Sequence, residues 1–551
     1  MRRAAVLAAL VAALAAAGPA AAAEPIAKQE AIAAADRDPK VREQRQQHPD
    51  LAATAAVDEG RWEVAYFSDG DQRALAIVSR QSGEVLESWT GHQIAWKMAR
   101  GYSGAFGHKL NAPYVFLPLC AIFLLGLVDW RRLRRVANLD LLVLLGFGVS
   151  HLFFNRAEIG LSVPLAYPVL LYLLGRCLWI GLRGRGEGLR PVWPAAWLIV
   201  AALFLLGFRV GLNAADSGAI DVGYAGVVGA DRIAHAEPIY DNFPSDISSG
   251  DTYGPVNYLA YLPFERIWPW SGEWDDLPAA HATAILFDVA VFALLILLGM
   301  RIRPGPDGQR LAATLAFGWA AYPYTAYVLE SNSNDSLVAA LVLATLLLLY
   351  RPALRGAALA AATWAKFVAA PLVPMYLTYR SGPSSAGGVR ARKPRAQDTP
   401  GRPALLFILG FALVTVAVMA WPAIEPGLKT FYDRTIANQA GRESPFSVWG
   451  QAPSLELLRI ALLVLLGGLA IAFAFIPRRK SLVQLAALSA ALLILLQLTL
   501  QHWFYLYIVW FYPLFLVALA AVREARDTPP NGLYFSVARP SEGGKRPTRA
   551  S

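Results

Sequence analysis

The chain has 551 residues, of which 56% are hydrophobic and 16% are charged, and its formal net charge is +10. So little charge excludes an ordinary soluble surface. The basic residues form short clusters between apolar stretches, a pattern typical of membrane topology that excludes nucleic acid as a partner. The two cysteines, Cys120 and Cys177, lie within apolar segments and indicate core residues, so a disulfide framework is excluded as well.

The first 23 residues have the pattern of a secretory signal peptide. Met1-Arg2-Arg3 precedes an alanine-rich and leucine-rich run that ends in Ala21-Ala22-Ala23. A basic start, a short apolar core and small residues at the end are typical of a cleaved export signal. We therefore expect cleavage after Ala23 and export of the residues that follow. An uncleaved first helix is the alternative.

Residues 24–110 predict a small α+β domain outside the cytoplasm, because they contain no apolar run long enough to span a bilayer. A charged helix is expected over 30–47, interrupted at Pro39. Three strand-like runs separated by turn residues follow it, at 61–67, 73–79 and 85–89. One helix followed by three antiparallel strands resembles a PepSY-type domain, and this resemblance implies a binding or regulatory role.

Twelve apolar runs after residue 110 predict the membrane-embedded part of the chain. They lie near 113–130, 139–154, 163–182, 192–210, 281–299, 311–328, 337–350, 356–378, 403–420, 457–476, 481–500 and 505–522. With the N-terminal domain outside and one crossing per run, the first four basic clusters between the runs fall on the cytoplasmic side. This distribution agrees with the positive-inside rule.

The rule fails at the run over 356–378, since a single crossing there would put the strongly basic loop over 380–402 outside. A re-entrant segment or a pair of short helices restores the cytoplasmic position of this loop and of every later basic cluster. Pro371 and Pro374, with Lys366 in the middle of the run, provide the break that such a hairpin needs.

The sequence therefore predicts an all-α polytopic protein of the bacterial plasma membrane, with about eleven full spans plus the re-entrant hairpin and a cytoplasmic C terminus. Three extra helices over 111–190 precede the main module over 191–522, and residues 523–551 form a disordered basic tail. Two outer loops, over 211–280 and 421–456, are much longer than the others. Long ordered loops are more often functional than idle, so we expect the chemistry on the outer face.

The motifs in this module resemble those of the GT-C glycosyltransferases, in particular the bacterial mannosyltransferases that use polyprenyl-phosphate mannose. Asp221-Val-Gly-Tyr224 follows a membrane helix, as the acidic motif of that family does. Ala236-Glu-Pro-Ile-Tyr240-Asp241 resembles its Gly-x-x-x-Tyr turn, with alanine where glycine is usual. Tyr253-Gly-Pro255 matches its Tyr-x-Pro element, and Lys366 precedes a Pro-Leu pair as a family-like lysine does. The resemblance covers about 192–520.

The resemblance implies an inverting hexosyltransferase that moves a mannose-like sugar from a polyprenyl-phosphate donor to a glycan or lipid acceptor on the outer face. A carboxylate would accept the acceptor proton, and cations would hold the phosphate leaving group. Asp221 is the expected base. The expected residues for binding donor phosphate or substrate are Lys366, Arg434, Arg442, His502, Tyr224 and Tyr253.

Other interpretations remain open for these residues. Asp221 could serve as a helix N-cap, and Asp216 is its main rival as the base. Lys366 could extend its ammonium to the interface. Glu330 and Asp335 belong to a short Asn/Ser/Asp-rich stretch that is more typical of a turn than of a sugar or metal site. No residues have the spacing of a metal site, so no cofactor is assigned and a divalent cation is left open. A transporter or flippase of a lipid-linked glycan or small solute is the alternative function.

Overall fold

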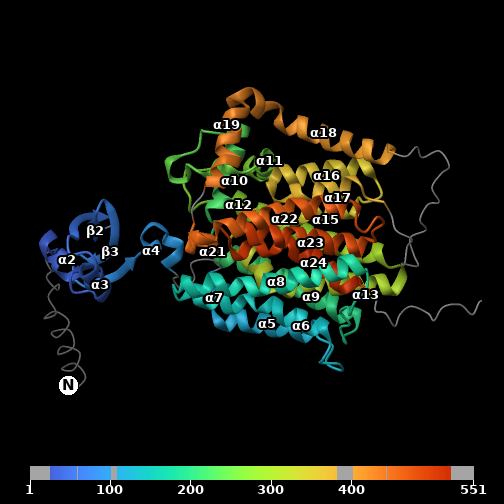
Figure 1. Cartoon of the computed structure of the whole chain (residues 1–551), viewed down its shortest axis with the longest axis horizontal. Coiled ribbons are helices and arrows are strands. Elements are labelled where there is room, and N and C mark those ends of the chain that lie inside the picture. Colours follow the sequence, from blue (N-terminus) through green and yellow to red (C-terminus); the bar gives the residue numbers. More distant parts are fainter. Residues whose placement is uncertain (1–24, 59, 101–107, 381–400, 442–443, 523–551) are drawn as a thin grey trace, which may run out of the picture.

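The computed structural model describes residues 25–58, 60–100, 108–380, 401–441 and 444–522 (Figure 1). A small α+β domain forms the N-terminal part and a large helical bundle forms the rest. The expected signal peptide over 1–23 and the expected basic tail over 523–551 lie outside the described residues.

The N-terminal domain packs two helices on one face of an antiparallel sheet. The strands follow one another across the sheet in the order β1-β2-β3-β4. Its core is formed by alternate strand residues such as Val64, Tyr66 and Val78, which are fully buried together with Ala31 and Val41 of the helices. The elements are α2 (Lys28–Ala35), α3 (Pro39–Gln47), β1 (Ala52–Asp58), β2 (Arg61–Ser68), β3 (Asp71–Ser79) and β4 (Val85–Thr90).

This domain contains one strand more than the sequence predicts. The three expected strands correspond to β2, β3 and β4, whereas β1 has the sequence Ala-Ala-Thr-Ala-Ala-Val-Asp. Alanine has a low β propensity, so β1 forms because it pairs along its whole length with β2. The expected interruption at Pro39 separates two helices, because Pro39 is the first residue of α3 and the Asp38 side chain caps it.

A short connection joins the sheet to the bundle through α4 (His92–Ala95), η1 (Lys97–Arg100) and η2 (His108–Asn111). The Gln93 amide donates to the Ala157 carbonyl, with a nitrogen–oxygen distance of 2.9 Å. The Trp96 ring packs on Phe446 of the bundle, with 5.6 Å between the ring centroids. The connection is therefore held against the bundle, at the end that faces the sheet (Figure 1).

The bundle contains the long apolar helices, and each of the twelve apolar runs overlaps at least one of them. Its first part comprises α5 (Pro113–Leu127), α6 (Val136–Leu145), α7 (Phe147–Asn155), α8 (Ile159–Arg183), α9 (Ala195–Asp216), α12 (Pro278–Ile302), α13 (Gly305–Ala321), α14 (Pro323–Glu330) and α15 (Asp335–Leu347). Its second part comprises α16 (Pro352–Ala365), η5 (Phe367–Leu372), α17 (Val373–Leu377), α18 (Arg402–Pro422), α22 (Glu456–Phe475), α23 (Leu482–Thr499), η9 (Tyr505–Tyr507) and α24 (Ile508–Ala521).

Two polar segments connect the long helices at one end of the bundle. The first contains α10 (Asp221–Ala234), η3 (Ser245–Ile247), η4 (Gly250–Thr252) and α11 (Pro255–Glu265). The second contains η6 (Ala423–Gly427), α19 (Leu428–Tyr432), η7 (Asp433–Ala437), α20 (Asn438–Gly441), α21 (Val448–Gln451) and η8 (Pro453–Leu455). The first corresponds to the loop expected over 211–280. The second overlaps the loop expected over 421–456, but its first part continues the helix that begins at Arg402 as far as Ala437.

Among the described residues, seven helices are long and apolar enough to cross a membrane. They span Val136–Asn155, Ile159–Arg183, Ala195–Asp216, Pro278–Ile302, Arg402–Ala437, Pro453–Phe475 and Leu482–Thr499. Four shorter apolar helices of 10 to 17 residues lie beside them. The chain thus has the helices of a polytopic membrane protein, together with a small antiparallel sheet.

The chain runs out and back between residues 350 and 379. Helix α16 ends at Ala365, Lys366 is extended with φ −151° and ψ 124°, and η5 and α17 follow. The Tyr379 ring lies 6.4 Å from the Tyr350 ring and 5.5 Å from the Arg355 guanidinium, which belong to the beginning of the segment. Both ends of the segment therefore meet, and Lys366 lies at its far end. The break occurs at Lys366 itself, whereas Pro371 and Pro374 lie inside the returning helices.

An ion pair inside the bundle joins two of the long helices. The Arg209 guanidinium of α9 lies 2.5 Å from an Asp288 carboxylate oxygen of α12, and both side chains are almost completely buried. The Trp319 indole donates to the same carboxylate at 2.9 Å. A buried charge is tolerated only when it is paired, so this contact fixes α9 against α12.

Candidate functional site

Asp221 is the first residue of α10, directly after the polar stretch that follows α9. Ile220 occupies the N-cap position, and the Asp221 carboxylate accepts the Val222 backbone N–H at 2.9 Å. The side chain is exposed at the positive end of the helix dipole, which favours a negative charge there. The structure thus puts Asp221 one residue beyond the N-cap position and leaves its carboxylate accessible.

Gly223 explains how the start of α10 reaches its position. A Cβ atom at this residue would lie 2.4 Å from the Asn332 carbonyl oxygen, so only glycine permits this close approach. The Ile220 N–H donates to the Ser331 carbonyl at 3.2 Å beside it. The first turn of α10 is therefore packed directly on the polar turn between α14 and α15.

Asp216 has a different environment from Asp221. It is the last residue of α9, and its carboxylate accepts the Lys109 backbone N–H at 3.1 Å and pairs with the Lys109 ammonium at 3.2 Å. These contacts tie η2 to the end of α9. Asp216 thus has a structural partner at the junction with the N-terminal domain.

Tyr224 is fully buried on the other face of α10. Its hydroxyl donates to Asp246 at 3.1 Å, and its ring packs on Trp274 with 4.5 Å between centroids. Burial and the hydrogen bond to Asp246 raise the pKa of Tyr224 to about 12. The sequence predicts a substrate contact for Tyr224, whereas the structure gives this side chain contacts within the first polar segment.

Tyr253 lies between η4 and α11, against the end of α16. A Cβ atom on the next residue, Gly254, would lie 1.9 Å from the Trp364 carbonyl oxygen, so glycine is required for this contact. The Tyr253 carbonyl accepts the Tyr240 hydroxyl at 3.0 Å, and its N–H donates to the Tyr258 hydroxyl at 3.2 Å. These bonds fix the backbone of the Tyr-Gly-Pro element directly beside Lys366.

Lys366 is surrounded by three rings and a carboxylate. Its ammonium lies 2.6 Å from Asp335 Oδ1 and 3.1 Å from Asn334 Oδ1. It also lies 5.3 Å from the Tyr253 ring centroid, 5.3 Å from that of Tyr507 and 5.0 Å from that of Trp510. Such distances are favourable for cation–π attraction. We call these three rings the aromatic cage of Lys366.

The carboxylate of Asp335 is completely buried under Lys366, whose side chain is 12% exposed. Asp335 Oδ1 also accepts the Trp510 indole N–H at 2.7 Å, and Oδ2 accepts the Ser333 hydroxyl at 2.9 Å. The polar turn between α14 and α15 therefore supplies the counter-charge of the lysine. The sequence predicts a phosphate contact for Lys366, and the structure gives its ammonium the Asp335 carboxylate as a partner.

Tyr253 is affected by the charge of Asp221 and contacts Lys366. Burial raises the pKa of Tyr253 well above its ordinary value, and the negative charges of Asp221 and Asp335 raise it further. Tyr253 thus lies within electrostatic range of both carboxylates while its ring covers Lys366. A half-buried phenol and a caged ammonium are thus in contact, and the exposed carboxylate of Asp221 acts on the phenol through its charge.

His502 extends this cluster towards the N-terminal connection. Its Nδ1 lies 2.9 Å from the Ser444 hydroxyl, and its ring lies 6.5 Å from that of Tyr507 and 5.9 Å from that of Trp96. Tyr507 in turn stacks on Trp510 with 4.2 Å between centroids. A continuous row of rings therefore joins Lys366 to the connection that leads to the small sheet.

Arg434, on the second polar segment, pairs with a carboxylate of the protein itself. It forms a two-pronged contact with Asp251 at 2.6 Å and 2.8 Å and a further hydrogen bond with the Ser248 carbonyl. Asp251 is buried, and its carboxylate also accepts the Asp241 N–H at 2.7 Å. Arg434 thus ties the two polar segments together. Arg442, the other arginine expected to bind phosphate, lies outside the described residues.

Sequence reasoning missed the partners of Lys366 and weighted the Glu330–Asp335 stretch towards a plain turn. The available signal in the sequence was a polar run between two apolar helices. The structure shows that every residue of this run, from Glu330 to Ser336, is buried. Glu330 is notable, since both of its carboxylate oxygens are buried without a hydrogen-bond partner in the described part of the chain. No group of three or more metal-ligating side chains occurs within the described ranges.

No protein-family model matches this chain, and no curated protein matches it either.

Proposed function

We propose that the chain is an inverting membrane glycosyltransferase of the GT-C type. In this proposal it transfers a mannose-like sugar from a polyprenyl-phosphate donor to a glycan or lipid acceptor on the outer face of the bacterial plasma membrane. The observation that supports it most is the contact of Tyr253 with caged Lys366, beside an exposed Asp221 whose charge raises the pKa of Tyr253. This cluster combines a base, a hydroxyl and a cation at one end of a bundle of apolar helices.

The proposed topology has the N-terminal domain outside, about eleven full crossings and a hairpin that enters and leaves on the cytoplasmic side. The return of the chain to Tyr350 and Arg355 at Tyr379 supports the hairpin. With this topology Lys366 reaches towards the outer face from inside the membrane. Asp221 and the two polar segments approach the same cluster from outside.

In the proposed reaction Asp221 accepts the proton of the acceptor hydroxyl as its oxygen attacks the anomeric carbon of the sugar. The new carbon–oxygen bond forms as the bond to the donor phosphate breaks on the opposite face, so the configuration inverts. The electron pair leaves with the polyprenyl phosphate. Lys366 and His502 supply positive or proton-donating groups for this leaving group, and the aromatic cage of Lys366 offers rings for the sugar and the prenyl chain.

Replacing Asp221 by asparagine tests the proposal, because asparagine keeps the size of the side chain and removes the base. We expect sugar transfer from polyprenyl-phosphate mannose in proteoliposomes to fall by about a hundredfold to ten-thousandfold. Asp216→Asn is the matched control, since Asp216 lies five residues earlier and pairs with Lys109. It should retain transfer.

Full activity of Asp221→Asn would refute Asp221 as the base. If the wild-type protein transferred sugar from none of a panel of polyprenyl-phosphate donors and the same vesicles took up a solute, the transporter alternative would replace the proposal. Folding of each variant is checked by size-exclusion chromatography and circular dichroism.

A further inference from the structure

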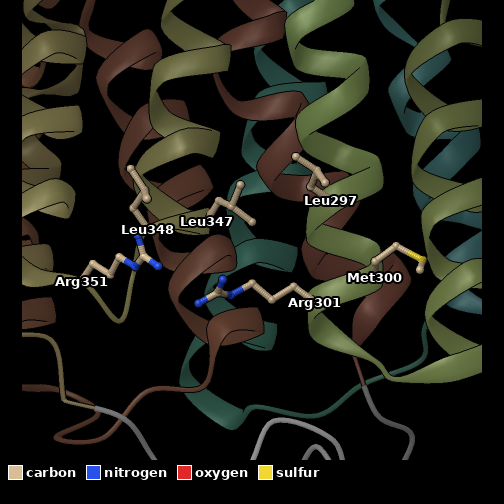
Figure 2. Close-up of a pocket in the computed structure, with 6 residues that line it drawn as sticks. All are labelled: Leu297, Met300, Arg301, Leu347, Leu348 and Arg351. Atoms are coloured by element: carbon tan, nitrogen blue, oxygen red, sulfur yellow. The ribbon is translucent and has the colours of Figure 1, made fainter.

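A pocket of about 440 Å³ lies at the C-terminal end of α12, whereas the first polar segment leads into the N-terminal end of the same helix. It opens between the last turn of α12 and the connection from α15 to α16. Figure 2 shows two arginines that extend toward each other from the two walls, with leucine side chains above them. The lining residues are Leu297, Met300, Arg301, Leu347, Leu348 and Arg351.

Within the described ranges, the two arginines of this pocket have no acidic partner. No acidic side chain lines it, and neither Arg301 nor Arg351 forms an ion pair with any carboxylate in the described part of the chain. The Arg301 guanidinium lies 5.5 Å from the Tyr350 ring, and its Nε is buried without a hydrogen-bond partner among the described residues. Two guanidinium groups that face one pocket favour an anion with several acceptor oxygens, such as a phosphate.

The walls of the pocket point to a lipid rather than to a free anion. Leu297 and Met300 are 52% and 46% exposed, on a helix that is apolar enough to cross a membrane. Tyr350 and Leu354 beside them are also about half exposed. Large apolar side chains next to arginines at the end of a membrane helix lie where lipid chains meet their head groups. The pocket therefore offers both a cationic part and a hydrocarbon part.

We propose that this pocket binds an anionic glycerophospholipid in the leaflet that the end of α12 reaches. The phosphate group lies between Arg301 and Arg351, and an acyl chain lies along Leu297 and Leu347. Basic pockets between membrane helices are favourable sites for such head groups. This site is independent of the proposed sugar transfer, because it shares no residue with the cluster around Asp221 and Lys366.

The test uses the full chain in nanodiscs of phosphatidylcholine, titrated with phosphatidylglycerol and read by native mass spectrometry of the bound lipid. Arg301→Gln combined with Arg351→Gln should weaken phosphatidylglycerol binding roughly twenty-five-fold, since each arginine near an anionic lipid contributes a factor of about five. The matched control is Arg132→Gln combined with Arg134→Gln. It removes the same charge from an exposed connection and should leave the affinity unchanged.

A second variant separates a lipid from a soluble anion. Leu347→Trp fills the apolar part of the pocket and leaves both arginines in place, so it should also exclude the lipid. Equal phosphatidylglycerol binding by the wild type and the double arginine variant would overturn the site. Competition by glycerol phosphate or inorganic phosphate as strong as that of the lipid would overturn its assignment to a lipid. Sugar transfer is measured in parallel, and loss of lipid binding with retained transfer supports the independence of the two sites.

Discussion

Replacing Lys366 by methionine removes a charge and keeps an unbranched side chain that is one heavy atom shorter. In the wild type the Lys366 ammonium lies 2.6 Å from Asp335, whose carboxylate is completely buried. Methionine leaves this carboxylate without its counter-charge, although Trp510 and Ser333 continue to donate hydrogen bonds to it. The expected result is a protein whose folded state holds an unpaired buried charge.

Breaking a buried ion pair by removing one partner costs about 3–5 kcal/mol. The remaining donors to Asp335 offset part of this cost, and the loss of cation–π attraction to the aromatic cage adds to it. We therefore expect Lys366→Met to lower the free energy of unfolding by about 3 kcal/mol. Adding Asp335→Asn to Lys366→Met removes the unpaired charge and should restore about half of the loss.

Unfolding in mixed detergent micelles, followed by tryptophan fluorescence, measures these differences. Lys429→Met is the matched control, because Lys429 pairs with Asp433 at 2.5 Å but is 91% exposed. An exposed pair contributes little to stability, so this variant should unfold like the wild type. If Lys366→Met were no less stable than Lys429→Met, or if adding Asp335→Asn restored nothing, the buried pair would not account for the position of Lys366.

Substitutions at two residues of the first polar segment, Gly254 and Glu265, give further predictions. Gly254→Ala puts a methyl group 1.9 Å from the Trp364 carbonyl oxygen, so it should lower the free energy of unfolding by about 3 kcal/mol and abolish sugar transfer. The control is Gly211→Ala on α9, where the new methyl group meets no atom, and this variant should melt at the same temperature as the wild type or higher. Burial raises the pKa of Glu265, and the charge of Asp231 raises it further. The folded state then holds the Glu265 proton more tightly than the unfolded state, so stability is lost as the pH rises through the folded pKa. Glu265→Gln should melt higher than the wild type at about pH 8 and equally at about pH 4, and equal melting at both pH values would contradict this.

The sequence predicts the helical part of this fold well because its signal is local. A run of apolar residues forms a helix almost regardless of its neighbours, and each of the twelve runs coincides with helix. The requirement that the basic loop over 380–402 stays on the cytoplasmic side also predicts that the chain reverses direction near Lys366. Strand β1 escapes prediction because its alanines have no strand preference of their own and depend on the edge offered by β2.

The candidate site is less predictable because its contacts are distant in the sequence. Arg434 and Asp251 are 183 residues apart, and Trp510 and Asp335 are 175 apart. Nothing in the local pattern selects these pairs. The backbone of Ala236 is equally hard to predict, since its φ of +57° lies in the region that favours glycine although the residue is alanine.

The ion pair between Arg209 and Asp288 also bears on how the chain enters a membrane. An arginine or an aspartate in the middle of a membrane helix makes the insertion of that helix less favourable by about 3 kcal/mol. Both charges are masked only when α9 and α12 lie side by side. Synthesis must therefore run past the whole first polar segment before either charge finds its partner. Until α12 has been made, the unpaired Arg209 keeps the insertion of α9 less favourable by this amount.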